Sequence, residues 1–374
     1  MHYQWIEHPD QLQTLAHDLQ HSQSNALDTE FIKVDTLYPK LGLLQINVNK
    51  DVYLVDGHLD LSMIWDSIFK AKLNVFHACG EDVDLIYHYA KNRPLDNILD
   101  TQVAMSFLGY GRQVGYQAAL EQVLNIHVDK DQTRSNWLAR PLSEDQIRYA
   151  VSDVYYLQDL ADQLISDLKQ KQLYDLVMED CHHYCLSLAE QTPLEDVYLD
   201  VANYRHNARQ LIQLKQLATW REQLAIKLNQ PRSFILKNNT INNILERTPR
   251  SLTQLAAFEI KPSILREHGK TILALLHDLP EKDSWPTRLA RPYRFKSEKT
   301  KLRIDEKIAQ VSQQLNIPED VLMRKKWLTE ITQSALSERQ DITQLTPYLQ
   351  GWRLNYLTQP LLEIISEEKG FDRV

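Results

Sequence analysis

The stretch NALDTEF, residues 25–31, places two carboxylates, Asp28 and Glu30, among side chains that are otherwise apolar or small. Side chains two positions apart on a β-strand point to the same face of a sheet, so both acids share one side if this run is a strand. An Asp-x-Glu pair can also lie on an exposed strand face, where both acids contact solvent and have no functional role. The pair therefore indicates a functional site only if other parts of the chain bring further groups to it.

Short apolar runs rich in β-branched residues surround this stretch and predict strands at residues 26–31, 41–48, 51–56 and 74–79. Helical periodicity predicts helices near residues 82–90, 100–108, 116–125 and 144–170. Three successive strands followed by alternating strands and helices predict an α/β domain, with a mixed sheet and flanking helices. After about residue 200 the strand signals nearly vanish, so the rest of the chain is predicted to be helical.

Two later segments supply more acidic side chains. HACGEDVDLI, residues 77–86, places Asp82 at the start of an amphipathic helix, where an acid can also simply favour the helix dipole. YAVSD places Tyr149 and Asp153 four residues apart on one helical face, which could equally be helix surface. Carboxylates that share one pocket raise one another's pKa values, so such a cluster persists only with bound cations.

Carboxylate oxygens select hard cations such as Mg²⁺ or Mn²⁺ rather than zinc. Two such ions can stabilise both the attacking and the leaving oxygen in phosphodiester hydrolysis. The hydroxyl group of Tyr149 could then orient the attacking water. The acidic motifs therefore predict a site for two divalent metal ions that hydrolyses phosphodiesters.

Together with TRSNWLARPLSEDQ at residues 133–146, these motifs resemble the DEDDy class of 3′→5′ exonucleases, and within it the ribonuclease D family. The resemblance covers about residues 1–190 and implies a ribonuclease H-like exonuclease fold. The related DEDDh class would need a histidine where this chain has Arg148, which excludes it. The resemblance assigns metal binding to four acids and the positioning of water to one tyrosine: Asp28, Glu30, Asp82, Asp153 and Tyr149.

Charge is divided unevenly along the 374 residues. Residues 1–200 contain 14 Lys and Arg against 31 Asp and Glu, a net charge of −17, whereas residues 201–374 contain 28 against 19, a net charge of +9. An acidic half joined to a basic half suggests that the basic half holds a polyanion and the acidic half holds cations. Solvated surfaces alone could produce the same asymmetry.

The basic half contains a faint repeat, in which LNQPRSFILK (228–237) aligns without gaps to LNIPEDVLMR (315–324). This predicts two copies of a small helical domain, with chance similarity as the alternative. The first copy resembles the HRDC domain shared by RecQ-type helicases and ribonuclease D, a nucleic-acid-binding module, and the second resembles a degenerate copy. The expected parts are an exonuclease domain at 1–195, an HRDC-type domain at 205–285, a basic linker at 286–303 that could also touch RNA, and a divergent HRDC-like domain at 304–374.

Four further residues are weaker candidates for substrate contacts: His77, Lys33, Arg134 and Arg140. His77, at the end of a predicted strand, could contact the terminal nucleotide or be a satisfied core histidine. The three cationic side chains lie close to the motifs in sequence and could hold phosphates. For Arg140, which precedes Pro141, an internal salt bridge is the alternative.

Cysteine usage and hydropathy indicate the cellular compartment in which the protein is expected. Cys79, Cys181 and Cys185 are too few and too unevenly spaced for a disulfide framework. CHHYC at 181–185 is interpreted as helix packing rather than a zinc site, because a second ligand pair is missing. The sequence has no apolar run of ~18 residues and no signal-peptide pattern, so we expect a cytoplasmic protein without a membrane span.

The family resemblance implies a metal-dependent 3′→5′ exoribonuclease that trims tRNA precursors and other small structured RNAs and releases 5′-monophosphates. It also implies a monomer whose partner is RNA with a single-stranded 3′ end. A DNA 3′→5′ exonuclease of the same class is one alternative, because the catalytic motifs do not sense the 2′-hydroxyl. An inactive nucleic-acid-binding scaffold is a second alternative, but it predicts the loss of a metal ligand and all four acids are present.

Overall fold

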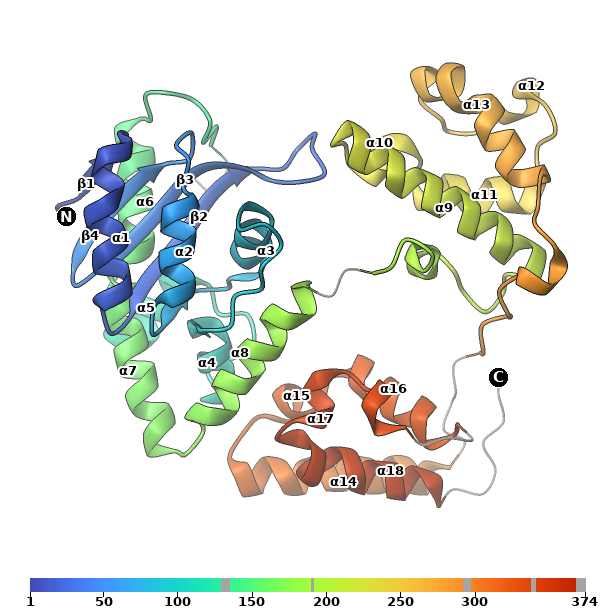
Figure 1. The fold of residues 1–374 in the computed structure, drawn as a ribbon. Helices are drawn as coiled ribbons and strands as arrows, with labels where there is room; N and C mark the ends of the chain where they lie inside the picture. The colour runs from blue at the N-terminus through green and yellow to red at the C-terminus, as the bar shows by residue number, and fades with distance from the viewer. Residues whose placement is uncertain (129–134, 190–191, 292–296, 338–340, 368–374) are drawn as a thin grey trace. The chain divides into compact units, whose positions relative to one another are not determined.

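The computed structural model describes residues 1–128, 135–189, 192–291, 297–337 and 341–367 (Figure 1). The chain separates into two compact units. The first contains the described residues within 1–32, 41–189 and 297–367, and the second contains those within 33–40 and 192–291. Among the helices described, none is long and apolar enough to cross a membrane.

The first unit is built on a six-stranded sheet with the order β1-β4-β3-β2-β5-β6. Strands β3 and β4 pair antiparallel, whereas β1 pairs parallel with β4, and β5 pairs parallel with both β2 and β6. The sheet is therefore mixed, as predicted, and β2 lies inside it. The strands are β1 (Gln4–Ile6), β2 (Asn25–Ile32), β3 (Lys40–Val48), β4 (Asp51–Asp56), β5 (Asn74–Phe76) and β6 (Ile98–Asp100).

Helices flank this sheet, and their apolar faces form one core with it. Helix α6 packs on β2 and β4, and α7 packs on β2 and β5. The flanking helices are α1 (Leu12–His21), α2 (Ser62–Lys70), α3 (Gly80–Tyr89), α4 (Thr101–Phe107), α5 (Tyr116–Leu124), α6 (Glu144–Tyr155), α7 (Leu157–Gln170) and α8 (Tyr174–Ala189).

Two predicted elements differ from the structure for local reasons. The strand predicted at 74–79 ends at Phe76, because the backbone turns at Ala78, which has a positive φ of 59°. The helix predicted at 144–170 is divided into α6 and α7 at Tyr156. Asn47 explains this break, because its side-chain amide donates hydrogen bonds to the carbonyl oxygens of Val154 and Tyr155 at the end of α6.

The second unit contains a set of helices with a core of its own. Its long first helix, α9, ends at Leu228, and Asn229 then adopts the left-handed conformation that commonly terminates helices. Two positions later, Pro231 prevents the helix from continuing. The set consists of α9 (Ala208–Leu228), α10 (Arg232–Ile235), α11 (Asn238–Arg247), α12 (Leu252–Leu255) and α13 (Pro262–His277).

A second set of helices repeats this order near the end of the chain. Its first helix, α14, begins at Glu298, inside the stretch predicted as linker, because the Ser297 hydroxyl caps it by accepting a hydrogen bond from the Thr300 amide. Asn316 ends α14 in the left-handed conformation, as Asn229 ends α9. The set consists of α14 (Glu298–Leu315), α15 (Glu319–Leu322), α16 (Lys325–Ala335), α17 (Pro347–Gln350), a π-helical turn (Leu354–Thr358) and α18 (Gln359–Ser366).

This second set shares the core of the sheet domain. Arg353 is fully buried and forms a two-pronged ion pair with Asp180 on α8, with Nη1–Oδ1 and Nη2–Oδ2 distances of 2.6 and 2.8 Å. The indole N–H of Trp352 also donates to Asp180, at 2.9 Å. Removing one partner of such a buried pair typically costs about 3–5 kcal/mol, so the pair specifies where this set of helices packs.

Candidate active site

Strand β2 brings Asp28 and Glu30 to one face of the sheet, and α6 brings Asp153 to the same place. Carboxylate oxygens of these three residues all lie within 4.8 Å of one another. The sequence prediction that the Asp-x-Glu pair is joined by the acid of a later helix is therefore met. Among the described residues, this is the only group of His, Cys, Asp and Glu side chains with the close spacing of a metal site.

The fourth acid, Asp82, lies in the first turn of α3, as predicted, and is only 8% exposed. Its Oδ1 atom accepts hydrogen bonds from the backbone amide of Thr29, at 3.1 Å, and from the Thr29 hydroxyl, at 2.5 Å. Thr29 is the residue between the two acids of β2, so it ties Asp82 to the strand that carries them. Asp82 is not one of the three acids that meet within 4.8 Å.

Helix α6 holds Tyr149 beside Asp153. A capping box starts this helix, in which the Ser143 side chain accepts from the Gln146 amide and the Gln146 side chain accepts from the Ser143 amide. The Tyr149 hydroxyl hydrogen-bonds to Asp153, which offsets part of the increase that burial causes in the pKa of that carboxyl. Trp137, which is 2% exposed, lies with its ring centroid 6.1 Å from that of Tyr149 and so limits the positions of the tyrosine ring.

Burial and mutual repulsion shift the pKa values of these acids upward. Desolvation is the largest cause for each, and it raises the pKa of Glu30 to about 9, of Asp153 to about 7 and of Asp82 to about 6. The pKa of Asp28 is raised well above its usual value by burial and then by the charges of Asp82, Asp153 and Glu30. The pKa of Tyr149 is raised for the same two reasons.

This donor set fits divalent metal ions. Within the described part of the chain, no Lys, Arg or His forms an ion pair with Asp28, Glu30, Asp82 or Asp153. Clustered carboxylates without a counter-charge favour the binding of cations, which restores their charged forms. Because all the ligand atoms are carboxylate oxygens, the site suits hard ions such as Mg²⁺ or Mn²⁺ rather than ions that prefer thiolates.

Sequence reasoning missed two residues that hold the acids in place, Thr29 and Gln45. The Gln45 side-chain amide donates to Asp28 Oδ2 at 3.2 Å from the neighbouring strand β3, and it is fully buried. A signal was present, because Gln45 is one of two polar side chains in the mainly apolar run LGLLQINV, and a buried polar side chain needs a partner.

The structure gives different outcomes for the weaker candidates for substrate contacts. Both ring nitrogens of His77 have partners, Nδ1 with the Thr101 hydroxyl at 2.8 Å and Nε2 with the Val114 carbonyl oxygen at 2.9 Å. Arg140 forms the internal salt bridge that the sequence left open, because its Nε and Nη2 atoms lie 2.7 and 2.8 Å from Asp56 oxygens. Arg134 lies outside the described residues.

Lys33 belongs to the second unit, together with the rest of residues 33–40. This segment is held there by Asn229, whose carbonyl oxygen accepts from the Leu37 amide and whose side-chain oxygen accepts from the Tyr38 amide. Lys33 lines an open pocket of that unit with further basic side chains, from Arg221, Arg232 and Lys237.

Comparisons with known proteins agree with this geometry. Residues 3–169 match a family described as 3′-5′ exonuclease, and residues 210–276 match the HRDC domain family. The chain is 31% identical to ribonuclease D of Pseudomonas paraeruginosa, over 97% of each chain. The chain belongs to the ribonuclease D family. Similarity to Escherichia coli ribonuclease D is 27% identity over 98% of this chain and 99% of that protein.

The fold of ribonuclease D is shared over the whole chain. The crystal structure of Escherichia coli RNase D, described as an exoribonuclease involved in structured RNA processing, aligns with a TM-score of 0.89 and 26% identity, and it covers 99% of this chain and 100% of that one. The chain is thus a 3′→5′ exoribonuclease, and its substrate is RNA. Membership of the ribonuclease D family sets aside both the DNA exonuclease and the inactive scaffold.

The cysteines of this chain belong to its core. Cys79, Cys181 and Cys185 are free and buried, and burial raises the pKa of each thiol. Cys181 and Cys185 lie on α8, and Sγ of Cys181 accepts from the Asp100 amide at 3.5 Å. The interpretation of CHHYC as helix packing is therefore confirmed for the two cysteines.

Proposed function

We propose that this exoribonuclease removes 3′-terminal nucleotides by metal-dependent hydrolysis at Asp28, Glu30, Asp82 and Asp153, and releases 5′-monophosphates. The observation that carries this proposal is the group of three acids whose oxygens lie within 4.8 Å without a described cationic partner. Two bound Mg²⁺ or Mn²⁺ ions would supply an activated water and neutralise the charge that develops on the leaving oxygen. The preferred ion is part of the test below.

Each side chain has a distinct role in this proposal. Asp28, Glu30 and Asp153 would provide oxygens for a metal ion that activates the attacking water, and Asp82 would provide an oxygen for the second ion. Tyr149 orients the water through its hydroxyl group. Because the surroundings raise the pKa of Tyr149, this hydroxyl stays protonated at neutral pH and acts as a hydrogen-bond donor rather than as a base.

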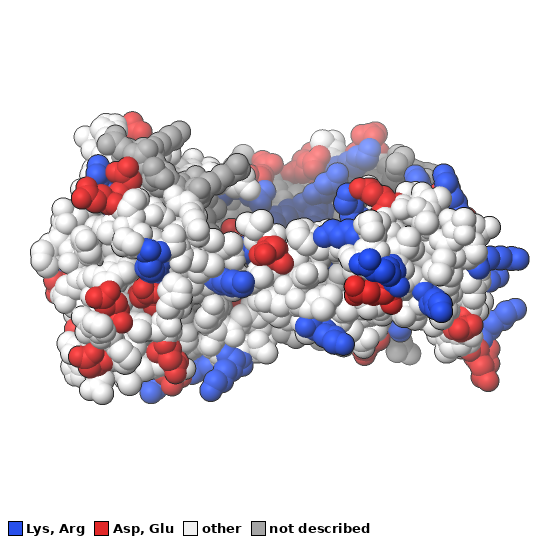
Figure 2. All heavy atoms as spheres, turned by 90° about the horizontal axis from the view of Figure 1, so that it is seen from above, with Lys and Arg blue, Asp and Glu red and all other residues white. Residues whose placement is uncertain are grey.

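The basic helical unit supports the proposal by offering a surface for the RNA body. Residues 191–294 contain 16 Lys and Arg against 10 Asp and Glu. Figure 2 shows Lys and Arg side chains spread over the exposed face of this part, at the right of the view, interspersed with Asp and Glu. Such a surface attracts the phosphate backbone without reading the bases, as expected for an enzyme that trims several RNAs.

The open pocket that contains Lys33 is one hollow of this unit. It has a volume of about 690 Å³. Arg221 is only 5% exposed and donates through Nη1 to the Leu236 carbonyl and to Asn238 Oδ1, while its Nε has no partner among the described residues. Lys33 follows Glu30 by three positions. We infer that this pocket holds phosphates of the RNA.

The proposal also covers the RNA substrate, the oligomeric state of the enzyme and its location in the cell. We infer that the RNAs are tRNA precursors and other structured RNAs with a single-stranded 3′ end, since the Escherichia coli relative is described as acting in structured RNA processing. A monomer suffices, because all the proposed metal ligands come from one chain. A cytoplasmic location, where RNA precursors are made, goes with this proposal. The four expected domains, with boundaries at 195, 205–285, 286–303 and 304–374, remain a prediction.

One experiment tests the metal site and the substrate together. The protein is incubated with a 3′-overhang RNA and a matched DNA, in Mg²⁺, in Mn²⁺ and in EDTA, and the products are separated by length. We expect stepwise shortening of the RNA with either ion and none in EDTA. Asp28→Asn should abolish shortening, whereas Asp159→Asn, on the exposed face of α7, should not. Unchanged trimming by Asp28→Asn would show that the site is assigned wrongly.

A further inference from the structure

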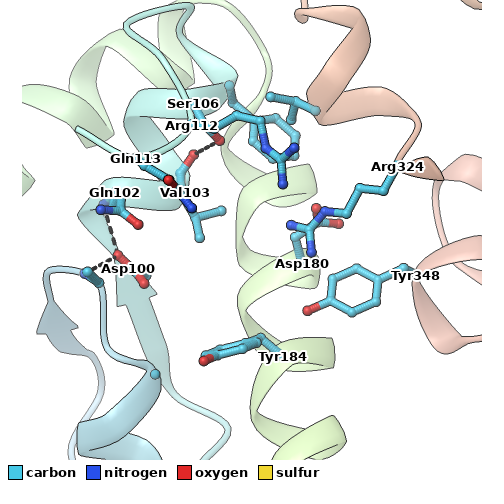
Figure 3. Close-up of a pocket in the computed structure, with 14 residues that line it drawn as sticks. Asp100, Gln102, Val103, Ser106, Arg112, Gln113, Asp180, Tyr184, Arg324 and Tyr348 are labelled. Carbon is cyan, nitrogen blue, oxygen red and sulfur yellow. Dashed lines mark hydrogen bonds between the residues drawn. The ribbon is translucent and has the colours of Figure 1, made fainter. Parts of the chain in front are cut away.

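A second pocket lies in the first unit, between the sheet domain and the C-terminal set of helices (Figure 3). Its volume is about 350 Å³, within the range of about 300–1,000 Å³ that is usual for small-molecule sites. One wall comes from α4 and the loop after it, the back from α8, and the opposite wall from the C-terminal helices. The side chains discussed below are Asp100, Arg112, Asp180, Tyr184, Arg324 and Tyr348.

Two arginines from different parts of the chain converge on this pocket. Figure 3 shows the guanidinium groups of Arg112 and Arg324 directed into it from opposite walls. Arg112 Nε lies 4.0 Å from Asp320, at the limit of an ion pair, and no carboxylate forms an ion pair with Arg324 in the described part of the chain. Desolvation lowers the pKa of Arg324, and the charge of Arg112 lowers it further. An anion between these two groups would relieve their repulsion.

The carboxylate oxygens of the two acids of the pocket already have hydrogen-bond partners within the protein. Asp180 is occupied by the buried ion pair with Arg353 and by the Trp352 indole. Asp100 is 5% exposed and accepts hydrogen bonds from three backbone amides, those of Ala78, Cys79 and Gln102. The acids are therefore satisfied within the protein, whereas the arginines remain available to a ligand.

Aromatic hydroxyl groups complete the polar lining. The Tyr348 hydroxyl points into the pocket, whereas the Tyr184 hydroxyl lies against Gly80 at its edge. Arg324 lies over the Trp327 ring, with its guanidinium carbon 4.6 Å from the ring centroid, so the arginine is held in place without losing its hydrogen-bond donors. Donors on two guanidinium groups and the Tyr348 phenol match the three outer oxygens of a phosphate group.

We propose that this pocket binds a phosphate monoester of mononucleotide size, with its phosphate between Arg112 and Arg324. The natural candidate is a nucleoside 5′-monophosphate, an identification that rests on the function proposed above because such nucleotides are its products. The site is separate from the four metal-binding acids and uses none of their side chains.

Occupancy of this pocket is coupled to the active site through one short segment. Asp100 holds the amides of Ala78 and Cys79, which directly precede α3, and Asp82 lies in the first turn of that helix. Ala78 and Gly80 also line the pocket. A bound nucleotide therefore contacts the segment that positions Asp82, so accumulated product slows RNA trimming from this second site.

Binding is tested on the full-length protein in EDTA, where no RNA is hydrolysed. Calorimetric titration uses adenosine 5′-monophosphate as the probe and adenosine as the matched control without phosphate. We expect saturable binding of the nucleotide only. Arg112→Gln and Arg324→Gln should each weaken it on the order of tenfold, which is the loss of about one charge-assisted hydrogen bond. Lys326→Gln, which removes an exposed charge at the start of α16, should leave the affinity unchanged.

Three results would overturn the proposal: no saturable binding of the nucleotide, equal affinity for adenosine, or unchanged affinity in both arginine variants. Arg324→Lys keeps the charge and the fold and should restore part of the affinity, which separates loss of the site from loss of structure. In trimming assays, added nucleotide should inhibit the wild type more than Arg112→Gln. Activity without added nucleotide, and its loss in Asp28→Asn, tests the proposed catalytic site independently of this pocket.

Discussion

The carboxylate site on β2 and the basic pocket around Lys33 differ in how far their charges are compensated by neighbouring side chains. The acids of the first are largely buried and repel one another, and burial raises the pKa of Glu30 to about 9. In the second, Arg232 forms an ion pair with Glu222, and Lys237 forms one with Glu259. The acidic site is thus incomplete without added cations, whereas the basic pocket is stable as it stands.

This difference supports the proposal that the carboxylate site performs the chemistry and that the basic pocket holds the substrate. A cluster that is unfavourable without ligand binds metal ions strongly and loses its function when one acid is removed. A pocket in which Arg232 and Lys237 are already paired gains less from each phosphate, so its contribution to RNA binding is expected to be modest and sensitive to salt. The predictions below follow this contrast, and those on catalysis and RNA binding run from the largest expected effect to the smallest.

Removal of one metal ligand has the largest expected effect. Asp153→Asn keeps the size of the side chain but removes the charge, and it should lower kcat for RNA trimming by at least about a thousandfold, or roughly 4 kcal/mol. Single-turnover rates with Mg²⁺ measure this loss. Asp159→Asn, six residues later and exposed, is the control and should retain wild-type rates. A rate within tenfold of wild type for Asp153→Asn would contradict the assignment.

Loss of the water-orienting hydroxyl should have a smaller effect. Tyr149→Phe keeps the ring beside Trp137 and removes only the hydroxyl group, so we expect kcat to fall about a hundredfold with KM nearly unchanged. Steady-state kinetics on a short single-stranded RNA separates the two constants. Tyr155→Phe, on the same helix, is the matched control. An increase in KM at constant kcat would instead assign Tyr149 to substrate binding.

Changes in the basic pocket should weaken RNA binding without altering the chemistry. Lys33→Gln or Lys237→Gln should raise the Kd for RNA several-fold and reduce the slope of log Kd against log salt by about 0.7 for each lost phosphate contact with single-stranded RNA. Filter binding at several salt concentrations measures both quantities. Lys270→Gln, exposed on α13, tests whether any lost charge of this unit has the same effect. If the slope of log Kd against log salt is the same for all three variants, the pocket has no special role in RNA binding.

The pH dependence of stability is the prediction most specific to the acidic site. The folded-state pKa values of Glu30, Asp153 and Asp82 are raised to about 9, 7 and 6, so the metal-free native state binds more protons than the unfolded chain. Its stability therefore falls as pH rises from about 4 towards 9. Bound Mg²⁺ or Mn²⁺ should counteract this fall, so that the increase in Tm on adding metal grows with pH.

Thermal unfolding in EDTA and in Mn²⁺, at pH 6 and pH 9, checks this expectation. Glu30→Gln cannot titrate and should lose less stability between the two pH values than the wild type does in EDTA. An identical pH profile for this variant would show that the site contributes nothing to the pH dependence of stability.

Much of the site was predictable because its geometry is largely local. Asp28 and Glu30 alternate correctly along a strand, and Tyr149 and Asp153 share a helical face at a spacing of four. Asp82 falls in the first turn of α3, as expected from the residues around it. Thr29 and Gln45 were missed because their roles depend on neighbours 53 and 17 positions away in the chain.

The two sets of helices show where such prediction ends. Asn229 and Asn316 end the long helices α9 and α14 in the same way, so the sequence by itself determined the repeated order of helices. The tertiary structure decided that the first set forms its own core while the second joins the core of the sheet domain. The periodicity of apolar residues specifies a helix and its buried face, because both depend on neighbours a few positions away. Which surface covers that face depends on contacts such as Asp180 with Arg353, 173 positions apart, which exist only once the chain has folded.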